Sequence, residues 1–510
     1  MKTVLLSLVF LSAPWVAFSA ITQVEVGSSP VASSEEKVEE VGEGDSSHLA
    51  IKAFNEGRYF AAIMRAKPLA AEGNPHALML MGVAYESGRG VNQSFDQALE
   101  NYRKARAAGS KRAPYRMARI LGTTGQETHQ KEAREILVSL AKEDQGEAAR
   151  ILGEGSVKGL FGGGGDFEKA AVWWETAATQ GDAAAVFALA QLFDGAFGFP
   201  EKRDQAAALQ YYIKAARLGV SRAMVIAGAR LLNGEEQLRD EKRGLDFLSS
   251  AIVNKQIDAH FVLGDYAENV TKSDAVAFKH YLNGAEAGQS KCMLKVAAFI
   301  VGGRAEQEKN ALAALAWFKK AGAAGEVIGH VEAARILLTG EGLQIVEGYG
   351  HLVAAADAGL IDVQNEVGLL YLSGRLGVRD AAAAASWFRR SAEGKYPAGA
   401  YNLAVLYQQG LGVTQNFDQA GRLFTLAANA GHPQAATALG LINAAGRGTQ
   451  QNLPRAWALF SLGLERGDKE AEGYKKEVAG YLDEGGMKKA AEILAGYQKA
   501  ATQPTSGAEK

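Results

Sequence analysis

Residues 74–109 read NPHALMLMGVAYESGRGVNQSFDQALENYRKARAAG, and this stretch carries two helical patterns joined by a glycine turn. In its first half, small or apolar residues recur at Ala77, Met81 and Tyr85, a spacing that lies on one face of a helix. Residues 88–91 (GRGV) predict a tight turn, and a second helical pattern follows them. The stretch therefore predicts a pair of antiparallel helices.

The same pattern recurs along most of the chain. A glycine that follows one helical segment and precedes the next returns every 32 to 38 residues, with Gln256 in the one gap. Each glycine fits the position just past a helix, where the backbone needs a positive φ angle that glycine adopts without steric cost. A steady period of this length is typical of stacked helical repeats. The glycines are Gly73, Gly109, Gly146, Gly181, Gly219, Gly288, Gly325, Gly359, Gly394, Gly431 and Gly467.

Within the repeats, the second helix follows a strict register. Nine repeats start it with a residue whose side-chain oxygen can accept hydrogen bonds from the free amides of a helix start, which predicts an N-cap. These residues are Ser94, Asp166, Asp204, Asp240, Ser273, Asn310, Asp380, Asn416 and Asn452. A large apolar residue stands eight positions later, between small residues at offsets of four and eleven, all on one helical face. We expect these large side chains to be buried between repeats: Tyr102, Trp174, Tyr212, Leu248, Tyr281, Phe318, Phe388, Phe424 and Phe460.

The columns predict an all-α fold, an α-solenoid or superhelix of about twelve antiparallel helix pairs over residues 46–498. The pattern resembles the Sel-one-like repeat (SLR) family, relatives of the tetratricopeptide repeat, most closely in residues 74–109, 397–431 and 433–467. The resemblance implies a scaffold for protein complexes, in bacteria often in the cell envelope. Some cysteine-rich members have been linked to β-lactam binding, but their paired cysteines are missing here. The alternative reading is an envelope hydrolase or a β-lactam-binding protein.

The two ends of the sequence differ from the repeats. Residues 1–19 combine Lys2, a short apolar run and the small residues Ala17 and Ser19, which predicts a signal peptide cleaved next to Ala20. Residues 20–45 are acidic, and we expect them to form a disordered leader. We expect residues 499–510 to form a disordered tail. The expected location is therefore outside the cytoplasm, periplasmic or secreted, with no membrane span in the mature protein.

Composition argues against several other functions. The net charge of −2 gives no basic excess, so we expect no nucleic-acid partner. The lone Cys292 excludes an internal disulfide, and no two histidines have the spacing of a metal-binding helix, so we expect no metal and no cofactor. The Ser-x-x-Lys match at residues 34–37 lies in the leader, and the glycine run 162–165 lacks the lysine of a phosphate loop. We expect a non-enzymatic protein with no catalytic residues, a site assembled across repeats being the open alternative.

One column invites a functional reading. The residue after the small residue in the middle of the first helix is polar in some repeats, at Arg119, Arg150, Gln191 and Arg335, and apolar in others, at Val83, Leu369, Val405 and Leu441. Because first helices line the concave face of such solenoids, this column predicts a surface that binds a protein or peptide partner, polar and partly basic in the middle repeats and more apolar near the C-terminus. The alternative is that the arginines are solvated and the apolar residues pack against neighbouring repeats.

Overall fold

The computed structural model describes residues 38–143, 145–160, 165–375, 377 and 379–502. The expected signal peptide, leader residues 20–37, the Ser-x-x-Lys match at 34–37, residues 162–164 of the glycine run and tail residues 503–510 lie outside these ranges. The described chain contains 26 α-helices, two short 3-10 helices and no strand, which confirms the all-α fold class. It divides after Arg239 into two compact units, here called unit 1 and unit 2.

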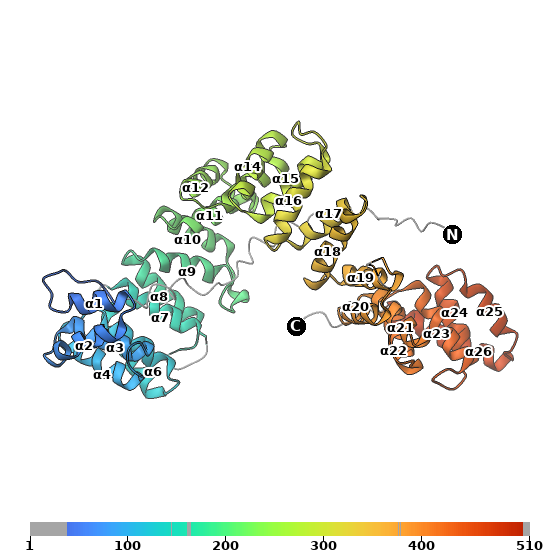
Figure 1. Cartoon of the computed structure of the whole chain (residues 1–510), viewed down its shortest axis with the longest axis horizontal. Coiled ribbons are helices and arrows are strands. Elements are labelled where there is room, and N and C mark those ends of the chain that lie inside the picture. Colours follow the sequence, from blue (N-terminus) through green and yellow to red (C-terminus); the bar gives the residue numbers. More distant parts are fainter. Residues whose placement is uncertain (1–37, 144, 161–164, 376, 378, 503–510) are drawn as a thin grey trace. The chain divides into compact units, whose positions relative to one another are not determined.

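Unit 1 contains eleven α-helices and both 3-10 helices, and Figure 1 shows its helices following one another in chain order. Their bounds are α1 (His48–Asn55), α2 (Tyr59–Ala71), α3 (Pro75–Ser87), α4 (Phe95–Ala107), α5 (Ala113–Thr123), α6 (Glu127–Lys142), α7 (Gly146–Val157), α8 (Phe167–Thr179), α9 (Ala183–Phe193), η2 (Pro200–Lys202), α10 (Gln205–Arg217), α11 (Ser221–Asn233) and η3 (Glu236–Leu238). Odd-numbered helices are the first helices of the repeats and even-numbered helices are the second, in both units.

Unit 2 holds the other fifteen helices, and consecutive helices pack against each other until the end of the chain, where α26 packs on α24. Their bounds are α12 (Glu241–Val253), α13 (Asp258–Asn269), α14 (Asp274–Glu286), α15 (Ser290–Gly302), α16 (Ala311–Ala323), α17 (Val327–Leu337), α18 (Leu343–Asp357), α19 (Ile361–Ser373), α20 (Ala381–Glu393), α21 (Pro397–Gln409), α22 (Phe417–Asn429), α23 (Pro433–Ala445), α24 (Leu453–Glu465), α25 (Ala471–Ala479) and α26 (Glu484–Thr502).

The expected caps form in nearly every repeat. Eight of the nine side chains accept a hydrogen bond from the amide three residues later, as Asn416 does from Gln419 at 3.0 Å. Ser273 stands at the N-cap of α14 but makes no such bond. The nine predicted large side chains are all buried, between 0% and 5% exposed. The local register read from the sequence is therefore confirmed.

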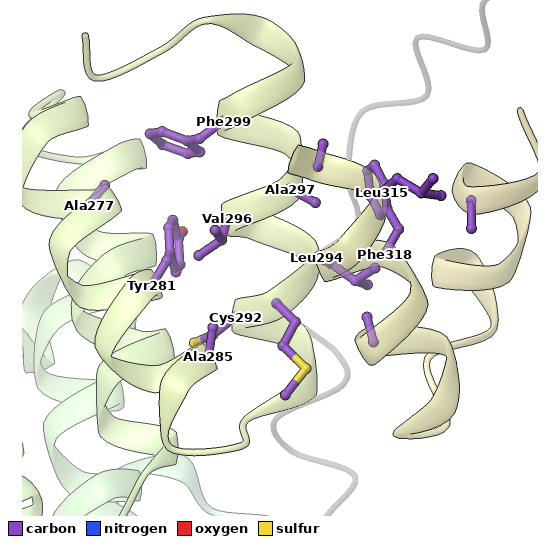
Figure 2. Packing of buried hydrophobic residues seen from close by; sticks show 14 of the residues in the cluster. Ala277, Tyr281, Ala285, Cys292, Leu294, Val296, Ala297, Phe299, Leu315 and Phe318 are labelled. Atoms are coloured by element: carbon purple, nitrogen blue, oxygen red, sulfur yellow. The ribbon is translucent and has the colours of Figure 1, made fainter. Parts of the chain in front are cut away.

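Close packing explains the small residues that face these large side chains. A Cβ atom added at Gly82 would lie 2.3 Å from a ring carbon of Tyr102, and one at Gly440 would lie 2.6 Å from a ring carbon of Phe460. Figure 2 shows the same arrangement around α15, where Tyr281 and Phe299 lie among small and aliphatic side chains. Each ring thus fills the gap between helices that approach closely.

The glycine column holds at nine of its eleven positions, with φ between 86° and 102°. It is wrong at Gly146, which is the first residue of α7, and at Gly394, whose φ is −71°. After α12 and α20 the left-handed residue is a lysine, Lys255 (φ 59°) and Lys395 (φ 64°), so Gln256 does not fill the gap. The helix-ending hydrogen bonds still form there, because the amides of the next residues, Gln256 and Tyr396, donate five residues back.

The boundary of the ordered chain also differs from the expectation at residue 46. Val38 is buried, donates its backbone amide to Asn55 Oδ1 at 3.0 Å and accepts from Asn55 Nδ2 at 2.8 Å. Further along, His76 contacts Asp45 at 2.8 Å. Residues 38–45, assigned above to the leader, therefore pack on first helices α1 and α3 of unit 1.

Candidate interaction surface

The functional column occupies one position on successive first helices, ten residues after the left-handed residue that precedes each helix. In unit 1 it holds Arg119 on α5, which is exposed, and Gln191 on α9, which is half-buried. In unit 2 it holds four of the predicted residues, from α17, α19, α21 and α23: Arg335, Leu369, Val405 and Leu441. The described backbone thus places six of the seven predicted residues in equivalent positions.

Arg150 is the exception, and its placement corrects the sequence reading. On α7 the small residue that faces the ring of Trp174 is Gly153, where an added Cβ would lie 2.4 Å from the indole nitrogen. The column residue is therefore Glu154, one turn after Arg150. The error came from aligning the repeat on Gly146, which does not end the preceding helix.

The arginines of unit 1 are held by carboxylates of the same surface. Arg119 and Arg116 both bind Glu86, Arg116 at 3.2 Å. Arg150 contacts Glu154 at 2.6 Å and Asp182 at 3.2 Å. Burial acts to lower the pKa of Arg150, but these carboxylates outweigh it and raise the pKa. The face is therefore polar, and its arginines are ion-paired within the protein.

The Arg116–Glu86 pair belongs to an arrangement that occurs three times in the described chain, which we call the acid–tyrosine clasp. In each, a carboxylate at the end of a first helix accepts a hydrogen bond from the tyrosine of the second helix and pairs with a base on the next first helix. The clasps are Glu86–Tyr102–Arg116, Asp194–Tyr212–Arg230 and Glu268–Tyr281–Lys295. Each ties one repeat to the following one within its unit.

The clasps have a signal in the sequence that the column analysis missed. The acid stands four residues after the small residue of the first helix, and it occurs in the three repeats whose ring is tyrosine. Where the ring is phenylalanine, in α16, α20, α22 and α24, the same position is Val301, Leu372, Gln408 or Ala444. A buried phenol needs an acceptor and a phenyl ring does not, which accounts for the pairing.

The apolar residues of the column that remain partly exposed lie in unit 2, whereas Val83 on α3 of unit 1 is buried. Leu369 on α19 is 44% exposed and Leu441 on α23 is 37% exposed, while Val405 on α21 between them is half-buried. Beside them the amide of Asn402 donates to Asn365 Oδ1 at 2.8 Å, bridging α19 and α21. Glu366, on the same side of α19, has its pKa raised by burial and then by Asp362. Three successive first helices thus present apolar side chains next to hydrogen-bonding groups, which we call the apolar stripe.

The described part of the chain also bears on other kinds of chemistry. No group of three or more His, Cys, Asp or Glu side chains there is placed to hold a metal ion. The Cys292 thiol is buried, and burial followed by the charge of Asp258 raises its pKa to about 12. Among the helices described, none is long and apolar enough to cross a membrane.

Comparison with solved structures finds other repeat proteins of this kind. A protective antigen of uropathogenic Escherichia coli with an SLR fold is 21% identical, covering 88% of this chain and 99% of that one, with a TM-score of 0.46. A Sel1 repeat protein from Oxalobacter formigenes is 22% identical, covering 64% of this chain and 93% of that one, with a TM-score of 0.48. A search of curated proteins gave no match.

The pattern of the Sel1 repeat matches seven segments of the chain, which together span half of it. The segments are residues 75–110, 146–182, 183–220, 290–326, 361–396, 397–432 and 433–468. The gaps between them fall on repeats that the structure shows as helix pairs but whose residues depart from the family pattern. With its helix pairs, caps and buried rings, the chain belongs to the Sel1 repeat family, whose members are protein-interaction scaffolds.

Proposed function

We propose that the protein is an exported, non-enzymatic scaffold of the bacterial cell envelope, periplasmic or secreted, and that its first-helix face binds a segment of a partner protein. The observation that carries the binding proposal is the apolar stripe of Leu369, Val405 and Leu441. In solenoids of this kind the first helices line the concave face. The residue at the equivalent position is polar in three other repeats, which carry Arg119, Gln191 and Arg335 there.

The stripe suits a partner that offers apolar side chains at regular intervals. Covering exposed leucine gains roughly 25 cal/mol for each Å² of apolar surface removed from water. A helix or an extended segment laid across α19, α21 and α23 would meet one such side chain from each repeat. The neighbouring Asn402 and Glu366 supply polar groups that can fix the partner's orientation.

Affinity capture from the native envelope tests the binding surface. Tagged full-length protein is compared with Leu369→Glu and Leu441→Glu, and with Leu426→Glu as the matched control. Leu426 is 43% exposed, a fraction similar to that of Leu369, but it lies on the second helix α22. We expect the two stripe variants to lose the captured protein and the control to retain it, with equal thermal stability by circular dichroism. Capture that is lost in the control and kept in the stripe variants would reject this surface.

Export is tested separately by the mass of the mature protein. Cleavage next to Ala20 follows from Ala17 and Ser19, the small residues that a signal peptidase requires. We expect the intact mass of protein from the periplasm or medium to correspond to a start at or next to Ala20. Protein that retains Met1, or that fractionates with the cytoplasm, would contradict export while leaving the binding surface open to the capture experiment.

A further inference from the structure

Two pairs of histidines meet inside unit 2, although the members of each pair are far apart in sequence. Nδ1 of His260 on α13 lies 3.4 Å from Nδ1 of His280 on α14. Nδ1 of His330 on α17 lies 2.8 Å from Nδ1 of His351 on α18. All four rings are half-buried. Each pair therefore joins the first and second helix of a single repeat.

The two pairs occupy equivalent positions. His260 and His330 stand five residues after the left-handed residues Lys255 and Gly325. His280 and His351 stand one residue before the buried residues that fill the ring position of their second helices, Tyr281 and Leu352. Both repeats lie in gaps between the segments that match the family pattern. The same unusual contact has thus been built twice.

Both histidine pairs lie where helices pack closely. At Gly284 an added Cβ would lie 3.1 Å from His260 Cβ and 2.6 Å from the sulfur of Cys292 on α15. At Gly322 on α16 an added Cβ would lie 2.9 Å from His330 Nδ1. The Cβ of His260 is therefore packed against α14 and the ring of His330 against α16, so repulsion between the facing rings acts on closely packed helices.

A contact between two Nδ1 atoms requires unlike partners. In a neutral imidazole one nitrogen donates and the other accepts, whereas both nitrogens donate in the protonated ring. One ring of each pair must therefore present a lone pair. If both rings are protonated, two N–H groups and two positive charges face each other, and the contact becomes repulsive.

The surroundings of the pairs mainly disfavour protonation of the rings. Burial lowers the pKa of His260, and burial, His260 and Lys279 lower that of His280. Burial, His330 and Lys319 of α16 lower the pKa of His351, with Glu347 on the same helix opposing them. Glu347 is itself paired with Lys319.

We propose that the two histidine contacts are acid-sensitive joints, at which protonation of both rings separates the two helices of a repeat and loosens unit 2 locally. In a solenoid each repeat contacts its neighbours along the chain, so an opened repeat interrupts the alignment of the first helices on either side of it. The second joint lies in the repeat directly before α19, which carries Leu369. This regulation goes beyond the proposed function and does not depend on it.

The direction of the pH effect follows from proton linkage. Burial, and then the facing ring in the case of His280 and His351, lowers the pKa of His260, His280 and His351 in the native state. The opened state therefore binds more protons below the ordinary value of about 6.5. The stabilisation is complete above that pH and is lost as the pH falls below it. One extra proton changes the opening equilibrium by up to about tenfold for each pH unit below about 6.5, so between pH 7.5 and pH 5.0 we expect opening to increase by up to about thirtyfold.

Hydrogen exchange of the full-length protein at pH 7.5 and pH 5.0, corrected for intrinsic rates, tests the proposal. We expect α13–α14 and α17–α18 to lose protection at pH 5.0, while α9 and α10 of unit 1, two helices that contain no histidine, keep it. The variants His280→Gln and His351→Gln remove one titrating ring and should each abolish the pH effect in their own repeat alone. His330→Gln serves if His351→Gln is unfolded at pH 7.5. His129→Gln, on α6 of unit 1, is the control and should change neither repeat.

Three outcomes would overturn the proposal. One is an equal loss of protection in all helices at pH 5.0, and another is a pH effect that persists in the His280→Gln and His351→Gln variants. The third is protection of α17–α18 that increases on adding Zn²⁺ at pH 7.5 and disappears in His351→Gln, which would assign the pair to metal binding.

Discussion

At the scale of single residues, Gly329 shows how closely two helices of unit 2 approach. A Cβ added there would lie 2.5 Å from the backbone nitrogen of Gly322 and 2.6 Å from the carbonyl oxygen of Phe318. Gly421, in the middle of α22, has nothing within 4 Å of the same position. We expect Gly329→Ala to lower the free energy of unfolding by about 1–3 kcal/mol, and Gly421→Ala to raise it by up to about 1 kcal/mol through helix propensity. Urea denaturation measures the free energy of unfolding of both variants. Changes of the same sign in the two variants would contradict the close packing at Gly329.

The acid–tyrosine clasp makes a second prediction at this scale. The Tyr281 hydroxyl donates to Glu268 at 2.8 Å, and Lys295 and Arg304 bind the same carboxylate. Burial acts to raise the pKa of Glu268, but the hydrogen bonds from Lys295 and Arg304 outweigh it and lower the pKa. Tyr281→Phe should destabilise unit 2 by about 1.5–3 kcal/mol, as expected for a hydrogen bond to a charged group. Tyr211→Phe removes an exposed bond to Glu175 and should change stability by less than about 0.5 kcal/mol. Thermal melts that rank the two variants in the opposite order would count against the clasp.

At the scale of the helix, the caps allow a matched comparison. Asn416 accepts a hydrogen bond from the amide of Gln419, whereas Ser273 occupies the same position without a bond. Asn416→Ala should therefore cost about 0.5–2 kcal/mol and Ser273→Ala much less. Chemical denaturation measures both, and equal losses would show that the cap bond is not the source of stability. Neither substitution touches the apolar stripe, so partner capture by the folded protein should be unchanged.

Helix starts and buried faces could be predicted from the sequence because they depend on residues within one or two turns. The cap at Asn416 and the buried ring of Phe424 are eight residues apart on one helix. The ends of helices were harder to predict, because Lys255 and Lys395 adopt the left-handed conformation that glycine usually supplies. Their strain, roughly 1–2 kcal/mol, is offset by the hydrogen bonds that close the helix and by packing of the following repeat.

At the scale of the whole chain, stability should be distributed repeat by repeat. Phe424 is fully buried among residues of neighbouring helices in unit 2. Phe424→Ala should cost about 3–5 kcal/mol, and hydrogen exchange should increase first in α21–α23 while α9–α10 of unit 1 stay protected. Phe95→Ala, at a half-exposed ring on α4, is the control and should have little effect on exchange in unit 2. Exchange that increases uniformly along the chain in Phe424→Ala would argue against independent repeats.

The candidate site was only partly predictable on this scale. Leu369, Val405 and Leu441 could be placed on one face because each lies in a repeat whose register is unambiguous. The pairing of Arg119 with Glu86 could not be foreseen, since the two residues are 33 positions apart and belong to different repeats. The histidine contacts were missed for the same reason, because their members lie 20 and 21 residues apart and no single helix carries both.

The clasps also determine whether repeats can be shuffled. Glu86 depends on a cation from the following first helix, which Arg116 supplies. If the repeat that begins at Asn74 were transplanted to precede Pro397, Asn402 would stand where Arg116 does now, and the carboxylate would lose that counterion at a cost of about 3–5 kcal/mol. Repeats with a phenylalanine ring carry no carboxylate that needs a cation from the next repeat, so they could be exchanged more freely. Repeats that resemble one another in sequence are therefore not interchangeable, and the order of the repeats along the chain is constrained by the ion pairs between them.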